Sequence, residues 1–177
     1  TTAPRNGLHI RTNTARLLKY RRMIIELLLS AHCRDCTTCE KNRTCRLQEM
    51  AVRFGIHHVR FEDTREHVDM DLSSPAITVD YNKCILCGDC VRVCHEMQGV
   101  NNLHFAGRGP NLHIATTDNK PLSETHCVSC GQCSAVCTTG ATTVKNEIGL
   151  AWKALHDPKM RVIVQIAPAV RVAIGEA

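Results

Sequence analysis

The chain has 177 residues, with 22 Lys+Arg against 17 Asp+Glu, 10 His and 12 Cys, and aromatic residues make up only 3%. This length suits one domain or two small ones and excludes a large catalytic domain beside the cysteine-rich part. No N-terminal segment resembles a secretory signal. No apolar run approaches the roughly 20 residues that cross a bilayer. We therefore expect a cytoplasmic chain without a membrane span.

The first half of the chain predicts two helices joined by turns, read from hydrophobic spacing. Residues 14–30 are expected as a helix capped by Thr12, Asn13 or Thr14. Its apolar stripe, spaced every three or four residues, consists of Leu17, Tyr20, Ile24, Leu27, Leu28 and Ala31. The other expected elements are a strand at 8–11, a helix at 46–54 ending at Gly55, a linker or exposed loop at 62–75 and a strand at 76–81.

The second half predicts short strands and one more helix. Residues 103–117 are expected as a hairpin that turns at 107–110, where two glycines flank Arg108. The remaining expected elements are a strand at 141–144, a helix at 147–156 and an apolar strand at 162–166. Together these predictions describe an α+β chain.

An internal repeat is the clearest organisational feature. Residues 84–94 (CILCGDCVRVC) and 127–137 (CVSCGQCSAVC) share all four cysteines and the glycine after the second cysteine. The cytosol keeps thiols reduced, so clustered cysteines there favour metal binding over disulfides. Gly88 and Gly131 fit a loop whose backbone curls closely around sulfur.

The spacing C-x2-C-x2-C-x3-C predicts two interlocked 4Fe–4S clusters. Two-residue gaps let three thiolates converge on one cluster, and the fourth cysteine lies too far along the following helix to reach that cluster, so it serves the other cluster. A disulfide knot and paired zinc sites are the alternatives, but zinc normally takes two C-x2-C pairs. The predicted ligand sets are Cys84, Cys87, Cys90 and Cys137 for one cluster, and Cys127, Cys130, Cys133 and Cys94 for the other.

A different cysteine group follows the first predicted helix. His32, Cys36, Cys39 and Cys45 offer one imidazole and three thiolates from one loop. A third 4Fe–4S cluster is favoured, and a zinc site or scattered core residues are the alternatives. An imidazole in place of a thiolate makes a cluster less negative, which raises its reduction potential. Cys33 is left over, as a packing residue or spare thiol in preference to an alternative ligand.

Charge argues against nucleic-acid binding. Three such clusters would contribute about −5, which offsets the formal charge of +5. The Lys and Arg residues are not grouped in runs, and aromatic side chains for base stacking are scarce.

Residues 76–146 resemble a bacterial-type ferredoxin with two 4Fe–4S clusters. The family usually has Pro after the fourth cysteine of each motif, whereas this chain has His95 and Thr138. Proline is not a ligand, so this departure concerns the local turn and not the cluster. The resemblance implies a ferredoxin-like domain for this part of the chain.

The combination of a segment with one His and three Cys and a two-cluster ferredoxin unit is similar to the electron-input arm of a wider group. That group contains NADH:quinone oxidoreductase, NAD-dependent formate dehydrogenase and the iron-only (FeFe) hydrogenases. Residues 157–177 are similar to the opening of the hydrogenase active-site domain. The implied organisation is a cluster segment at 1–61, the ferredoxin-like domain at 76–146 and the start of the active-site domain at 147–177.

The hydrogenase resemblance implies an electron-transfer module of a multi-subunit FeFe hydrogenase with three 4Fe–4S clusters, one ligated by a histidine and three cysteines and two ligated by cysteines alone. Its implied partners are subunits carrying flavin or 2Fe–2S centres and NAD(H), or a soluble ferredoxin. The active-site cysteines of that family have no counterpart in this chain, so no catalytic residue is assigned. The alternatives are the arm of a formate dehydrogenase or NADH:quinone oxidoreductase, a stand-alone polyferredoxin-like carrier and a cluster-based redox sensor.

Overall fold

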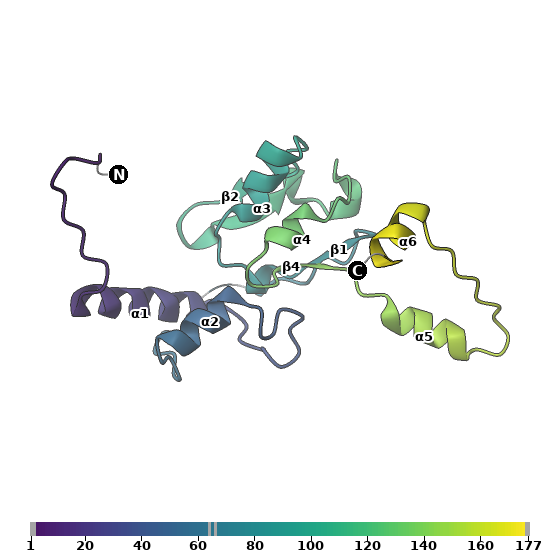
Figure 1. Ribbon diagram of the computed structural model, residues 1–177, viewed down its shortest axis with the longest axis horizontal. Helices are drawn as coiled ribbons and strands as arrows, with labels where there is room; N and C mark the ends of the chain where they lie inside the picture. The colour runs from purple at the N-terminus through teal and green to yellow at the C-terminus, as the bar shows by residue number, and fades with distance from the viewer. Residues whose placement is uncertain (1–2, 64, 66, 176–177) are drawn as a thin grey trace. The chain divides into compact units, whose positions relative to one another are not determined.

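The computed structural model describes residues 3–63, 65 and 67–175. The chain divides into two compact units, Thr1–Lys145 and Asn146–Ala177. Figure 1 shows both as mixtures of short helices, irregular segments and, in the first unit, two small sheets. The predicted α+β class is confirmed. No helix within the described ranges is long and apolar enough to cross a membrane.

Helix α1 (Ala15–Ser30) begins at Thr14, whose side chain accepts a hydrogen bond from the Leu17 N–H at 3.3 Å. The predicted helix is therefore confirmed, but none of the residues of its apolar stripe is fully buried. Ile24 is 56% exposed, whereas Ile25 and Glu26 are buried. The buried face is displaced because α1 packs on α2 (Arg46–Arg53) and takes a carboxylate into the contact region.

Glu26 is 2% exposed and is held by Arg60. Its carboxylate accepts three hydrogen bonds of 2.8 Å, from the Arg60 backbone N–H, Nε and Nη2. These bonds lower the pKa of Glu26 to about 2, although burial alone would raise it. The pair fixes the segment after α2 against α1, which is the helix that leads into His32.

Two further helix and strand predictions in this region have different outcomes. α2 ends next to Gly55, which has φ +60°, so the predicted second helix and its stop are confirmed within one residue. Residues 8–11 form no strand. Within the described residues 67–75 of the predicted loop, Asp71 instead pairs with Val79 and Ser74 is fully buried, so this part packs on the fold.

The remaining elements of the first unit form two antiparallel pairs around the repeat. Strand β1 (Ile77–Val79) pairs with β4 (Thr142–Val144), and the hairpin β2 (Leu103–Ala106) and β3 (His113–Thr116) turns at 107–112. Ile77, Val79 and Leu122 make the apolar core. The predicted strands and hairpin are confirmed, though β1 is shorter than expected. Short 3₁₀ turns occupy Tyr81–Lys83, Gly109–Asn111, Thr117–Asn119 and Leu122–Glu124.

The second unit contains two helices, α5 (Ile148–His156) and α6 (Pro168–Gly175). α5 agrees with the predicted helix. The predicted strand at 162–166 is wrong, because those residues are irregular and no described strand pairs with them. Apolar alternation marks a strand only when a partner supplies the ladder hydrogen bonds. Apolar side chains of the second unit, including Trp152 and Ile163, are exposed.

We predict that Glu26→Gln weakens the docking of α1, because a neutral amide cannot accept the charge-assisted bonds of Arg60. Since the pKa of Glu26 lies below that of an ordinary carboxyl, the stabilisation is complete above about pH 4.5 and fades as pH falls toward 2. A thermal unfolding midpoint measured at pH 7 on the cluster-loaded chain should therefore drop by several degrees. Glu49→Gln is the control, because the exposed Glu49–Arg46 pair contributes little. Equal midpoints for the two variants would contradict the assignment.

Candidate metal centre

The two cysteine loops of the repeat have the same backbone. Leu86 and Ser129, at equivalent positions before the second cysteine, both have positive φ, 59° and 54°. Gly88 and Gly131 are left-handed N-caps, at φ 75° and 72°, of helices α3 (Asp89–Arg92) and α4 (Gln132–Val136). Left-handed residues at these matched positions turn the loop back on itself. Both loops therefore present their first three cysteines in the same way.

The fourth cysteines are held differently in the two repeats. Cys94 lies in a π-helical turn, Val93–Met97, that continues α3, whereas Cys137 lies just after α4 in an extended conformation. The expectation that both lie along a helix is therefore wrong for Cys137. A Pro in place of His95 would remove a helix N–H and oppose the π-helical turn, so the departure from the ferredoxin pattern accompanies a change in local structure.

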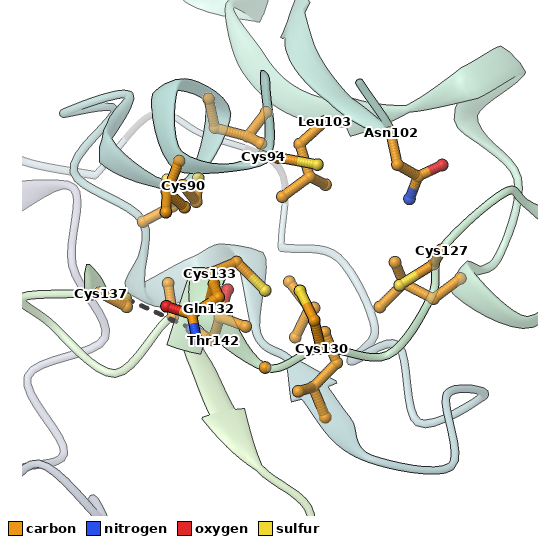
Figure 2. A pocket seen from close by; sticks show the side chains of 18 of the residues that line it. Cys90, Cys94, Asn102, Leu103, Cys127, Cys130, Gln132, Cys133, Cys137 and Thr142 are labelled. Atoms are coloured by element: carbon orange, nitrogen blue, oxygen red, sulfur yellow. Dashed lines mark hydrogen bonds between the residues drawn. The ribbon is translucent and has the colours of Figure 1, made fainter. Parts of the chain in front are cut away.

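One cavity is lined by all eight cysteines of the repeat, together with apolar side chains of the core such as Ile77 and Leu122. In Figure 2, Cys94 shares one side of this space with Cys127, Cys130 and Cys133, and Cys90 lies with Cys137 on the other side. Cys137 is also among the groups that raise the pKa of the Cys84, Cys87 and Cys90 thiols. Cys137 therefore lies near the three thiols of the first motif, and for Cys94 the side of the cavity seen in Figure 2 is that of the second motif.

The cavity strongly disfavours bare thiolates. Burial is the main cause that raises the pKa of Cys90 to about 12 and that of Cys133 to about 11. A bound cation reverses this preference, because metal ligation displaces the thiol protons. Backbone amides assist, since the Leu86 N–H donates to the Cys84 Sγ and the Thr142 N–H to the Cys137 Sγ, both at 3.4 Å. All twelve cysteines are free thiols in the structure.

The sulfurs of the repeat are arranged around one shared cavity. Within residues 3–63, 65 and 67–175, no three His, Cys, Asp or Glu side chains lie together as they would around a single metal ion. Sulfurs set around a shared apolar cavity suit the wider 4Fe–4S core, which thiolates bind at its corners.

His32 lies just past the C-terminus of α1, beside the first cysteine group. Burial is the main cause that lowers its pKa, and Arg65 and Lys83 add to the effect, so the imidazole is neutral. Its Nε2 atom is buried and has no hydrogen-bond partner, as expected for a ligand atom. Nδ1 accepts the Arg34 N–H at 3.2 Å, which places the imidazole proton on Nε2. Ligation through Nε2 requires that proton to move and this contact to open.

The thiols around His32 lie near one another. Burial is the main cause that raises the pKa of Cys36, followed by the neighbouring Cys45, Cys39 and Cys33. Cys33 is therefore close to the predicted ligands, but its exposure gives no support to a packing role. The six histidines without ligand spacing, His57, His58, His95, His104, His113 and His126, are exposed as expected.

The His32 site meets the repeat at the turn that follows Cys137. The Arg46 N–H donates to the Thr138 carbonyl at 3.2 Å, and the Thr139 hydroxyl donates to the Lys83 carbonyl at 2.7 Å. A Cβ on Gly140 would lie 3.4 Å from the Cys39 Sγ. Sequence patterns alone indicated neither Gly140 nor the buried Asn102, because a single Gly or Asn outside a repeated motif carries no distinguishing signal.

Two family models match the chain. Residues 21–60 match the NADH-ubiquinone oxidoreductase-G iron-sulfur binding region, and residues 74–143 match the ferredoxin-like domain of NADH-quinone oxidoreductase subunit 3. These ranges contain the His32 group and the cysteine repeat, respectively. The chain thus contains a segment that matches an iron-sulfur binding region and a segment that matches a ferredoxin-like domain, and these models do not single out an FeFe hydrogenase catalytic subunit.

Individual relatives are hydrogenase and oxidoreductase subunits. The NADP-reducing hydrogenase subunit HndD of Solidesulfovibrio fructosivorans is 40% identical over 97% of this chain and 29% of that protein. The NADPH-Fe(3+) oxidoreductase subunit alpha of Geobacter sulfurreducens is 34% identical over 81% of this chain and 17% of that protein. The crystal structure of an NAD+-reducing [NiFe]-hydrogenase in the H2-reduced state aligns with a TM-score of 0.70 and 30% identity, covering 75% of this chain and 57% of that one. The chain therefore spans less than a third of the first two relatives.

The crossed grouping of the fourth cysteines predicts how paired substitutions combine. If Cys84 and Cys137 serve one cluster, Cys84→Ala and the double variant Cys84→Ala/Cys137→Ala should each lose about four irons per chain. The double variant Cys84→Ala/Cys94→Ala should lose about eight irons per chain, because these two cysteines would serve different clusters. Iron and acid-labile sulfide on anaerobically purified protein measure the difference. A loss of about eight irons for Cys84→Ala/Cys137→Ala would reject the crossed arrangement.

Gly140→Ala should disturb the junction between the two cysteine regions. Its Cβ would lie 2.9 Å from the Lys41 Cγ, and the residue has φ +76°. Gly55→Ala is the matched control, because Gly55 has φ +60° but nothing within 4 Å of the added Cβ. Backbone strain alone costs about 1–2 kcal/mol. Chemical denaturation should therefore show Gly140→Ala to be less stable than Gly55→Ala; equal midpoints would mean that the contact with Lys41 and Cys39 is unimportant.

Proposed function

We propose that this chain is the electron-transfer region of a multi-subunit hydrogenase and holds three 4Fe–4S clusters. The observation that carries the proposal is the cavity lined by all eight cysteines of the repeat. The match of residues 21–60 to an iron–sulfur binding region supports a further cluster beside His32. Bound clusters of this type supply one-electron transfer without making bonds to substrate.

The proposed ligands form three sets. One set is Cys84, Cys87, Cys90 and Cys137, the second is Cys127, Cys130, Cys133 and Cys94, and the third is His32, Cys36, Cys39 and Cys45. In the first set, the backbone N–H groups of Leu86 and Thr142 donate hydrogen bonds to the sulfur atoms of Cys84 and Cys137. The neutral His32 ring leaves the third set with one negative charge fewer, which raises its potential.

The FeFe hydrogenase assignment is the finer part of the proposal. The hydrogenase subunit HndD aligns with 97% of the chain, whereas an NADH-quinone oxidoreductase subunit of Rhizobium meliloti aligns with 79%. This difference favours a hydrogenase over the equivalent arm of NADH:quinone oxidoreductase, which is the second candidate because both family models derive from it. The proposed partners are subunits that carry flavin, 2Fe–2S centres and NAD(H), or a soluble ferredoxin, in the cytoplasm.

The proposal predicts about 12 iron and about 12 acid-labile sulfide per chain in anaerobically purified protein, with no zinc. Metal analysis and low-temperature EPR of the reduced protein measure this directly. About eight iron with one zinc would limit the clusters to the repeat and make the His32 group a structural zinc site.

Substitution at His32 separates the third site from the other two. His32→Ala should lose about four iron and the signal of one cluster. His57→Ala is its control, because His57 is exposed and lies outside the cysteine group. Equal iron contents in the two variants would show that His32 is not a cluster ligand.

A further inference from the structure

The side chain of Asn102 is buried, has no hydrogen-bond partner and lies beside cysteines of the second proposed ligand set. It is 3% exposed, and neither its Nδ2 nor its Oδ1 has a hydrogen-bond partner in the structure. It lines the same cavity as the eight cysteines of the repeat. Figure 2 shows its amide on the side of that cavity that holds Cys94 and Cys127.

An unpartnered buried amide is costly, because each polar group left unsatisfied has lost its bonds to water. Such a group is expected where a ligand supplies the missing partner. The cysteines around this part of the cavity, Cys94, Cys127, Cys130 and Cys133, are proposed to hold a negatively charged cluster, whose sulfur atoms accept hydrogen bonds. An amide NH₂ is the donor that such an acceptor requires.

The local backbone keeps Asn102 in place. The Cys94 carbonyl accepts hydrogen bonds from the N–H groups of Val100 and Asn101, at 3.0 and 3.3 Å. Strand β2 then begins at Leu103. Asn102 is thus fixed between a cysteine of the second set and a strand of the hairpin, so its amide is positioned by the same turn that positions Cys94.

We propose that Asn102 donates an N–H···S hydrogen bond to the cluster held by Cys94, Cys127, Cys130 and Cys133, and that this bond raises the cluster's reduction potential. The inference rests on the proposed function. Reduction adds negative charge to the sulfur atoms, so a donor stabilises the reduced state more than the oxidised state. In the first set, the corresponding donors are the backbone N–H groups of Leu86 and Thr142.

The test is an EPR-monitored redox titration of the cluster-loaded chain and of Asn102→Leu, which keeps the side-chain volume and removes the donor. At a fixed applied potential, the ratio of reduced to oxidised second cluster should fall about tenfold, equivalent to a shift of about 59 mV for a one-electron couple. The other two clusters should titrate as in the parent. Gln98→Leu is the matched control, because Gln98 lines the same cavity but is exposed to solvent.

The outcomes separate this inference from the function on which it rests. A parent chain without about 12 iron overturns the proposed function. A loaded parent and a loaded Asn102→Leu with equal potentials overturn the role of Asn102 alone. If Asn102→Leu fails to load, Asn102→Ala decides, since it removes the donor without adding volume or charge; its second cluster should be harder to reduce than that of the parent, and an unchanged potential would refute the hydrogen bond.

Discussion

The first unit depends on one constraint: two cysteine-rich loops must face each other across a single cavity. The pair β1–β4 joins the chain shortly before Cys84 to the chain shortly after Cys137, and the β2–β3 hairpin connects the other ends of the two motifs. The apolar core formed by Ile77, Val79 and Leu122 is small, and Cys127 and Cys133 pack against it. The cavity walls are therefore part of the core itself, so we expect metal binding to stabilise the fold.

The His32 group is positioned by a helix and not by a pair of facing loops. It depends on a helix, α1, whose position relative to the chain after α2 is fixed by the buried Glu26 and by Arg60. It contacts the repeat through Arg46 and Thr138, and through the close approach of Gly140 to Cys39. Gly140 has no side chain, which leaves room for Lys41 and Cys39 at this junction.

The metal chemistry could be predicted from the sequence because it depends on spacing. Cysteines at fixed intervals make the same loop twice, and Leu86 and Ser129 adopt the same backbone despite their different side chains. Packing could not be predicted in the same way. Ile24 belongs to the apolar stripe of α1 but is exposed, and the carboxylate of Glu26 is buried instead. The burial of Ser74 and Asn102 depends on contacts between segments far apart in the chain. The strand expected at 162–166 is not formed, because an apolar pattern alone does not provide a neighbouring strand for hydrogen bonding.

That same stretch has a consequence for handling the protein. Residues 162–167 (VIVQIA) contain no charge and no proline, have high β-propensity, and include Ile163 and Val164 at 83% and 78% exposure. Six-residue segments of this composition pair edge to edge with identical copies and seed cross-β aggregates. Arg161 and Pro168 flank the segment directly, and such residues oppose strand addition. We therefore expect any self-association of concentrated preparations to involve this segment, and Val164→Lys should reduce it.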